Sequence, residues 1–324
     1  MTKLIIQIPC HNEEETLGLT LSTLPRRMEG VDLVEWLVID DGSGDRTVEV
    51  ARSAGVDHIV RNPARRGLAR TFLTGLRACL ARGADIIVNI DADNQYRAEC
   101  IPDLIRPILE HQADMVIGAR PIGETAQFSS LKKLLQKIGS SAVRLASRTD
   151  VPDAASGFRA FSREAALRLK VYNNYTYTLE TIIQAGQRGI ALISVPIQTN
   201  PTTRPSRLIK NTFSYVWLST STILRIFIVY RPFRFFAAVG GALTLLGLLL
   251  GLRFLYYFYL VGRGQGHIQS LILASVLIGI GFQTLMVAFL ADLLNVNRRL
   301  MEETEYRLRK LDLDRDRRDD VPPH

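Results

Sequence analysis

The stretch Ile86-Ile87-Val88-Asn89-Ile90-Asp91-Ala92-Asp93-Asn94-Gln95 decides the fold. Its apolar first half is typical of a buried strand, and the strand runs into two carboxylates spaced i, i+2 with a carboxamide two residues later. Open α/β sheets bind ligands at the carboxyl ends of their strands, which is where Asp91, Asp93 and Gln95 would lie. Oxygen ligands suit Mg²⁺ or Mn²⁺, and such an ion can bridge a carboxylate and a diphosphate. For this stretch alone, a polar loop that caps the following helix is the alternative.

The first 120 residues alternate short apolar runs with helical patterns, which predicts an α/β domain with a mostly parallel sheet and crossover helices. Strands are expected at Leu4–Ile8, Val34–Ile39, His58–Val60, Ile86–Ile90 and Met115–Ile117. Helices are expected around Glu13–Leu24, Arg46–Ser53, Gly67–Ala81 and Ile101–Glu110.

Two further strand ends finish in polar residues suited to a nucleotide. The first is IPCHNEE (residues 8–14), where a helix is expected to open with acidic residues, so that favourable charge at its N-terminus would also explain Glu13 and Glu14. The second is VIDDGSGDRT (residues 38–47), in which an Asp could accept hydrogen bonds from a ribose or a base. An Asp-Gly turn with Asp45 as helix cap is the alternative there.

The order and spacing of these runs resemble the family 2 glycosyltransferases with the GT-A fold, and among them the polyprenyl-phosphate glycosyltransferases such as dolichol-phosphate mannosyltransferase. The matching runs are IPCHNEEETL, VIDDGSGDRT, RRGLARTFLTGL, NIDADNQY, IGAR and DAASGFRAF, over roughly residues 4–165. The resemblance implies a GT-A (Rossmann-like, mostly parallel sheet) catalytic domain. It also implies transfer of a single sugar from a UDP- or GDP-sugar to polyprenyl phosphate, with inversion and with Mg²⁺ or Mn²⁺ as cofactor.

The resemblance assigns roles on the donor side residue by residue. The donor would contact Pro9, His11, Asn12, Glu13, Asp40, Asp41, Asp91, Ala92 and Asp93, and the metal would contact Asp91, Asp93 and Gln95. The metal would neutralise charge on the departing diphosphate, which makes Asp93 a catalytic residue in this assignment. The family usually has an aromatic residue where His11 stands, and an imidazole can also stack on a base.

The acceptor side needs a cationic cradle more than a strong base. A lipid monophosphate has a second pKa of about 6, so its dianion is already a competent nucleophile near neutral pH. The cradle must aim one phosphate oxygen at the anomeric carbon of the sugar. The candidate acceptor-phosphate ligands are Arg120, Lys132, Arg159, Arg204 and Arg207. The alternatives are a buried ion pair for Arg159 and a membrane-surface role for the other basic residues.

The acceptor-side motif DAASGFR (residues 153–159) also holds the candidate base. Some relatives carry an Asp immediately before the Phe, proposed as a base, and here that position is Gly157. The nearest acid is Asp153, which is predicted to be either a catalytic base or a partner in structural hydrogen bonds. Asp153 and Arg159 therefore join Asp93 as candidate catalytic residues.

Two apolar runs in the last third of the chain predict membrane spans. Residues 233–260 and 268–294 are each long enough for a hydrocarbon core, which needs about 20 residues. A buried-core hairpin is the alternative. The expected organisation is a cytosolic GT-A domain (1–208), an amphipathic juxtamembrane helix (209–232), the two spans, and a charged cytosolic tail (295–324). A basic amphipathic helix at 128–148 is expected to pack on its own domain or to lie on the membrane.

Charge suggests the orientation and the partners. No leader precedes the first strand, so the catalytic domain and both termini are expected in the cytosol. A net charge of +8 fits a protein that contacts anionic lipids and phosphates. The sequence has no basic stripe interleaved with aromatic residues, which is the pattern that would indicate binding to nucleic acid. The expected partners are a nucleotide-sugar donor, a polyprenyl (undecaprenyl or dolichyl) phosphate acceptor and membrane lipids. The two spans and the charged tail also permit a homo-oligomer.

Two other functions compete with this one. A processive polysaccharide synthase would need more spans and usually a Gln-x-x-Arg-Trp motif, and neither Trp36 nor Trp217 stands in that context. A non-catalytic membrane scaffold with a glycosyltransferase fold would predict damaged metal ligands, but Asp91, Asp93 and Gln95 are intact. Single-sugar transfer is therefore the favoured function.

Overall fold

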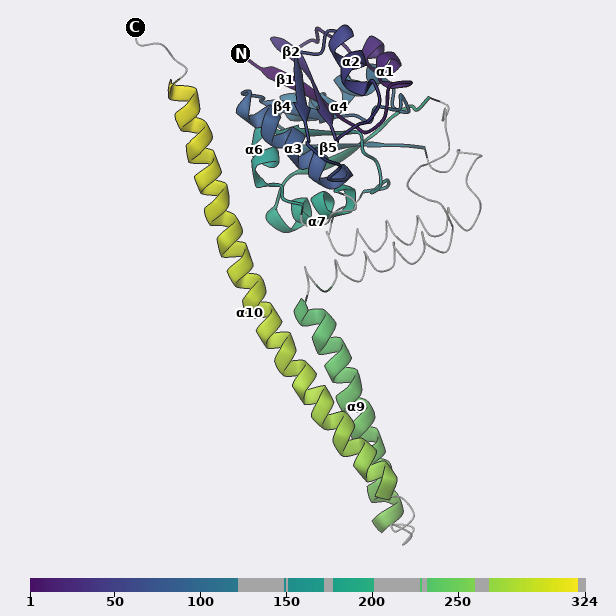
Figure 1. The fold of residues 1–324 in the computed structure, drawn as a ribbon. Helices are drawn as coiled ribbons and strands as arrows, with labels where there is room; N and C mark the ends of the chain where they lie inside the picture. The colour runs from purple at the N-terminus through teal and green to yellow at the C-terminus, as the bar shows by residue number, and fades with distance from the viewer. Residues whose placement is uncertain are drawn as a thin grey trace. The chain divides into compact units, whose positions relative to one another are not determined.

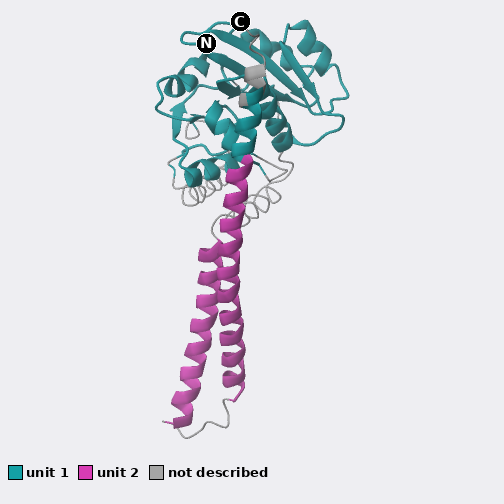
Figure 2. Ribbon diagram, turned by 90° about the vertical axis from the view of Figure 1, so that its left-hand side faces the viewer, with its two compact units in different colours: residues 1–220, 306–324 teal, residues 221–305 magenta. Residues whose placement is uncertain are grey.

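The computed structural model describes residues 1–121, 149, 151–171, 177–200, 228, 232–259 and 268–319. They fall into two compact units, Met1–Thr220 with Tyr306–His324, and Ser221–Glu305 (Figure 2). Lys132, Arg204 and Arg207 lie outside the described residues. So do the predicted helices at 128–148 and, apart from residues 228 and 232, at 209–232.

The first unit contains a seven-stranded sheet of order β3-β2-β1-β4-β6-β5-β7 (Figure 1). Its strands are β1 (Lys3–Cys10), β2 (Leu33–Asp40), β3 (His58–Arg61), β4 (Ile86–Asn89), β5 (Met115–Ala119), β6 (Arg159–Ser162) and β7 (Leu192–Pro196). β6 runs antiparallel to both of its neighbours, and the other pairings are parallel. The predicted mostly parallel α/β sheet is confirmed, and the strands β6 and β7 are additions to the five that were predicted.

Helices cover both faces of this sheet, and β1 is buried on both faces as a result. They are α1 (Leu17–Thr23), α2 (Thr47–Ser53), α3 (Leu68–Ala81), the short η1 (Ala98–Cys100), α4 (Ile101–Leu109), α6 (Arg163–Arg168) and α7 (Thr178–Arg188). On one face, Leu4, Ile6 and Ile8 share a core cluster with residues of α1 and α4. On the other face α3 approaches so closely that a Cβ at Gly75 would overlap Gln7 and lie 2.7 Å from Ile39 Cδ1.

The first helix begins later than predicted. It starts at Leu17 and carries no acidic residue in its first turn, so the helix-terminus explanation of Glu13 and Glu14 is wrong. The backbone N–H of Glu13 donates to Thr47 Oγ1 (2.9 Å) and that of Glu14 donates to Asp45 Oδ2 (3.2 Å). Side chains at the end of the loop after β2 and at the start of α2 therefore hold this segment as a turn.

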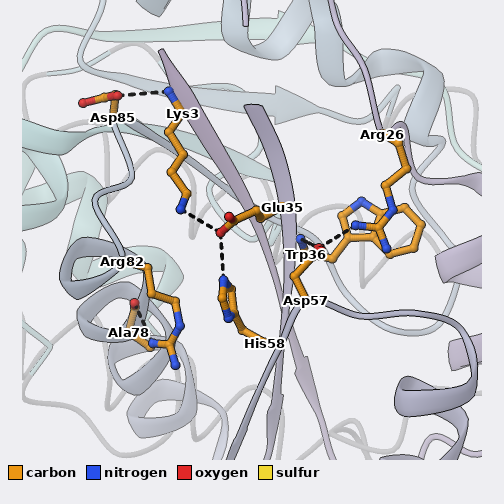
Figure 3. Close-up of polar contacts among 9 residues, drawn as sticks. All are labelled: Lys3, Arg26, Glu35, Trp36, Asp57, His58, Ala78, Arg82 and Asp85. Atoms are coloured by element: carbon orange, nitrogen blue, oxygen red, sulfur yellow. Dashed lines mark hydrogen bonds and ion pairs between the residues drawn. The ribbon is translucent and has the colours of Figure 1, made fainter. Parts of the chain in front are cut away.

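A half-buried polar cluster joins the amino-terminal halves of the first three strands, at the edge opposite the strand ends discussed below (Figure 3). Glu35 Oε2 lies 2.9 Å from Lys3 Nζ and 2.7 Å from His58 Nε2. Burial alone would raise the pKa of Glu35, but the hydrogen bonds from Lys3 and His58 outweigh it and lower the pKa. The ionised carboxylate is therefore stabilised in the folded state.

Glu35→Gln is expected to lower stability near neutral pH by about 1 kcal/mol, since one charge-assisted cluster is lost. Because the folded pKa of Glu35 is lowered, its contribution is complete above the ordinary glutamate pKa of about 4.3 and disappears as the pH falls through the folded value. The difference in unfolding midpoint between wild type and Glu35→Gln should therefore shrink in acid. Thermal unfolding across pH tests this, with the exposed Glu29→Gln as control. A difference that persists unchanged in acid contradicts the assignment.

The second unit consists of two long apolar helix segments, α9 (Pro232–Tyr259) and the part of α10 (Ile268–Asp319) up to Glu305. Both helices are long and apolar enough to cross a membrane. Large side chains such as Leu249, Leu290 and Leu294 are exposed, which argues against the buried-core alternative. The helix α10 continues without a break past the predicted end of the span at residue 294.

Small residues let α9 and α10 pack closely. A Cβ at Gly240 would lie 2.9 Å from the carbonyl oxygen of Gly281, and one at Gly247 would lie 3.0 Å from that of Ala274. Glycine at such contacts allows the backbones of membrane helices to approach each other. The interface therefore depends on the absence of side chains at these positions.

Gly240→Val is expected to force the two helices apart and to lower the thermal unfolding midpoint of the detergent-solubilised protein. The expected cost is about 1–3 kcal/mol, as for other overpacked contacts. Gly241→Val is the matched control, because a Cβ there meets nothing within 4 Å. Equal midpoints for the two variants would show that the close packing contributes no stability.

One turn of α10 contacts the rest of the first unit through Tyr306, while most of the residues that follow it are exposed. Tyr306 is buried and its hydroxyl donates to the Glu164 carboxylate of α6. The Arg168 guanidinium lies 4.9 Å from the centroid of the Tyr306 ring. Part of the predicted charged tail is thus anchored on the helix that follows β6.

Candidate active site

Three loops meet where β1, β2 and β4 end, because these strands are parallel neighbours in the sheet. The residues after β4 form a tight turn in which Asn94 has a positive φ of 54°. Asp93 Oδ1 accepts a hydrogen bond from the backbone N–H of Gln95 (3.1 Å). The Ala92 carbonyl accepts one from Thr20 Oγ1 (3.0 Å), which fixes this turn to α1. The two carboxylates are thereby held close to each other.

The charges of this turn fit a divalent cation. Burial and the neighbouring charge of Asp93 raise the pKa of Asp91 to about 7. Within the described part of the chain, the side chains of Asp91 and Gln95 make no hydrogen bond. The described residues contain no cluster of three or more His, Cys, Asp or Glu side chains that could hold a metal. Mg²⁺ is commonly bound by one or two carboxylates together with substrate phosphates, so Asp91, Asp93 and Gln95 fit such an ion with a diphosphate.

The loops after β1 and β2 are joined to each other by hydrogen bonds. His11 Nδ1 lies 3.0 Å from the Asp41 carbonyl oxygen. The Asn12 backbone N–H donates to Ser43 Oγ (2.9 Å), and Asn12 Oδ1 accepts from the Gly44 backbone N–H (2.9 Å). The predicted donor residues from Pro9 to Glu13 therefore lie beside Asp40 and Asp41, at the same edge as Asp91.

The two acids at the end of β2 hold loops in place. The Asp41 carboxylate accepts hydrogen bonds from Asn62 Nδ2 (2.9 Å) and from the backbone N–H groups of Arg66 and Gly67 (2.8 Å each). Burial alone would raise the pKa of Asp41, but these hydrogen bonds outweigh it and lower the pKa. Asp40 accepts from the Ser43 backbone N–H (3.0 Å) and lies 3.2 Å from Arg61 Nε. The Asp41 carboxylate thus holds the 62–67 loop beside the site. The sequence around Asp41 did not indicate this structural role.

Asp153 and Arg120 form a two-bond ion pair. Arg120 Nε donates to Asp153 Oδ2 (2.7 Å) and Arg120 Nη2 donates to Asp153 Oδ1 (3.1 Å). The Asp153 side chain is fully buried. Both carboxylate oxygens therefore accept hydrogen bonds from a single guanidinium. This geometry favours the structural alternative for Asp153 over the role of a base.

Arg159 is fully buried at the start of β6, and its guanidinium is used inside the protein. Nε donates to the Ser156 carbonyl (2.7 Å) and Nη2 to the Ala154 carbonyl (3.0 Å). Nη1 donates to the Thr178 carbonyl (2.8 Å) and to Thr181 Oγ1 (2.6 Å). Burial lowers the pKa of Arg159 to about 10, which leaves it cationic at neutral pH. The geometry favours a residue that ties the motif loop to α7 over a phosphate ligand.

Sequence reasoning missed a buried polar layer behind the two carboxylates. Asn89 Nδ2 donates to the Gly157 carbonyl (2.8 Å) and to Tyr177 Oη (2.9 Å), and Asn89 Oδ1 accepts from Gln7 Nε2 (2.8 Å). The available signal was the polar residue inside each of two apolar strands, LIIQI and IIVNI. Buried polar side chains are almost always hydrogen-bonded, so each of them indicated a partner.

Comparison with known proteins identifies the family. The glycosyl transferase family 2 model matches residues 5–169, and the chain belongs to this family. The protein is therefore a glycosyltransferase, and its first unit has the GT-A fold.

The matches to individual relatives extend over most of the length of those relatives. The chain is 34% identical over 206 residues to the uncharacterized protein MJ1222 of Methanocaldococcus jannaschii, which is 61% of this chain and 81% of that protein. It is 29% identical over 200 residues to the undecaprenyl-phosphate mannosyltransferase of Micrococcus luteus, which is 59% of this chain and 80% of that protein. Among solved structures, glucosyl-3-phosphoglycerate synthase from Mycobacterium tuberculosis, in complex with Mn²⁺, UDP and glucosyl-3-phosphoglycerate, has a TM-score of 0.53 and 21% identity over 70% of this chain and 79% of that chain. This structural likeness supports the fold alone.

Proposed function

We propose that the protein transfers a single sugar from a nucleotide sugar to a polyprenyl phosphate at the cytosolic face of a membrane, with inversion and with Mg²⁺ or Mn²⁺. The observation that carries the proposal is the pair Asp91 and Asp93, whose repelling carboxylates stand at the strand ends beside the two other polar loops. The Micrococcus luteus relative is an undecaprenyl-phosphate mannosyltransferase, which supports the acceptor class. The apolar helices α9 and α10 support an acceptor that resides in lipid.

On the donor side, Asp91, Asp93 and Gln95 would hold the metal ion. The ion would supply positive charge to the departing diphosphate. His11 and Asn12 would contact the nucleoside, since their loop is fixed against the loop after β2. Asp41 would contribute by holding the 62–67 loop beside the donor.

On the acceptor side, the reaction would proceed without a strong protein base. The phosphate dianion is a sufficient nucleophile near neutral pH, and Asp153 is committed to Arg120 through both of its oxygens. The Arg120–Asp153 pair and Arg159 would shape the motif loop beside the reacting groups. Lys132, Arg204 and Arg207 remain proposed ligands of the acceptor phosphate.

A direct assay tests the proposal. The full-length protein in detergent would be given Mn²⁺ or Mg²⁺, a short polyprenyl phosphate and a panel of UDP- and GDP-sugars, with mass spectrometry of the lipid products. The expected product is a polyprenyl phosphate that carries one sugar, lost on chelation of the metal. Donor hydrolysis without a glycolipid would overturn the acceptor assignment. The absence of both turnover and metal-dependent donor binding across the panel would overturn the function as a whole.

A further inference from the structure

Gly157 of the acceptor-side motif packs directly against the carboxylate of Asp91. A Cβ at position 157 would lie 2.9 Å from Asp91 Oδ2, 3.1 Å from Asp91 Oδ1 and 3.1 Å from Tyr177 Oη. Gly157 has no positive φ, so its backbone conformation is open to any residue. The missing side chain, rather than the conformational freedom of glycine, is therefore what this position requires.

The backbone of Gly157 is held from three sides and cannot readily retreat. Its N–H donates to Tyr96 Oη (3.1 Å). Its carbonyl accepts from Asn89 Nδ2 (2.8 Å) and from the Tyr177 hydroxyl (3.3 Å). Asn89 is itself held by Gln7, and the Tyr177 ring stacks on Phe72 with centroids 3.9 Å apart. All of these partners are buried, so the position of Gly157 is fixed by the core of the domain.

The carboxylate of Asp91 is constrained differently, because it makes no hydrogen bond within the described residues. Its position is set by the groups against which it packs. We propose that Gly157 is a positioning residue for the metal-binding carboxylate. Its Cα carries no side chain, so the Asp91 carboxylate packs directly against it and is oriented by that contact. The inference rests on the proposed metal-dependent function and extends it, since it makes the acceptor-side motif loop part of the metal site.

The consequence is specific. A methyl group at position 157 must displace the fixed backbone, the Tyr177 hydroxyl or the Asp91 carboxylate. The hydroxyl is hydrogen-bonded to Asn89 and Gly157, whereas the carboxylate has no hydrogen bond to hold it within the described residues. Residues that orient metal ligands typically change metal affinity by about 10–100-fold when they are mutated. Gly157→Ala should therefore weaken binding of the metal in the absence of any acceptor.

The test is titration of Mn²⁺ into the full-length protein in detergent, with UDP and in a second series with GDP, followed by calorimetry. Gly157→Ala is expected to bind Mn²⁺ about 10-fold more weakly than wild type. The matched control is Gly118→Ala, because its Cβ would be equally crowded, 3.0 Å from Phe158 Cδ1 and from Ile197 Cδ1, but against apolar groups. Gly118→Ala is expected to bind Mn²⁺ like the wild type.

The outcomes separate this inference from the proposed function. Wild type that binds no Mn²⁺ with either nucleotide would overturn the proposed function and, with it, this inference. Wild-type affinity in Gly157→Ala, or equal weakening in Gly118→Ala, would overturn the inference alone. If Gly157→Ala does not fold, Tyr96→Phe decides, because it removes the acceptor of the Gly157 N–H and keeps the ring that stacks on Phe158. Unchanged Mn²⁺ affinity in Tyr96→Phe would then overturn it.

Discussion

Asp93→Asn should greatly reduce turnover and leave the fold intact. The only hydrogen bond of the Asp93 side chain within the described residues is accepted from the Gln95 backbone N–H, and an asparagine oxygen can accept the same bond. The change removes one of the two charges that would bind the metal ion. Because the ion would offset charge that develops on the departing diphosphate, the loss falls mainly on the transition state. A decrease in kcat of about 100-fold or more is expected, as for other lost electrostatic contacts of this kind.

Product formation at saturating donor and a thermal unfolding midpoint together test this expectation. Asp103→Asn is a matched control, since it removes the same charge from an exposed carboxylate on α4 whose one ion pair within the described residues is with Arg106 of the same helix. The control should keep wild-type activity and midpoint, because exposed ion pairs contribute little. An Asp93→Asn enzyme within a few-fold of wild-type kcat would contradict the metal assignment.

The parallel part of the sheet was predictable because buried parallel strands are continuous apolar runs. Leu4–Ile8 and Ile86–Ile90 carry that pattern, and the structure places strands there. The strand β6 has no such pattern: it has four residues, and the first is the buried Arg159. It comes after β5 in the sequence but lies between β4 and β5 in the sheet. Such a long-range antiparallel pairing leaves no local signal in the chain.

The candidate site was predictable in part, for a similar reason. Asp91 and Asp93 follow an apolar strand directly, so their location follows from the strand alone. The partners of the other acids come from distant loops. Asp41 meets the backbone of Arg66 and Gly67, and Asp153 meets Arg120 across 33 positions of sequence. The sequence shows which residues carry charge, and only the fold shows which charges are already paired.

Arg159→Lys is expected to destabilise the protein strongly, which separates the two predicted roles of this arginine. A lysine keeps the positive charge but cannot span the Ser156, Ala154 and Thr178 carbonyls that the guanidinium bonds at once. Each buried carbonyl left unpaired costs about 1–3 kcal/mol. A total loss of about 3 kcal/mol or more corresponds to a fall in midpoint on the order of 10 °C for a chain of this size.

A phosphate ligand would behave in the opposite way. If Arg159 bound the acceptor phosphate, Arg159→Lys would retain the charge, raise KM for polyprenyl phosphate and leave the unfolding midpoint unchanged. The experiment therefore measures the midpoint and acceptor KM in the same preparation, with the exposed Arg52→Lys on α2 as control. The buried geometry favours a lower midpoint together with lower kcat, because the motif loop that Arg159 ties to α7 also carries Gly157 beside Asp91. A changed KM at an unchanged midpoint would show instead that Arg159 binds the acceptor phosphate.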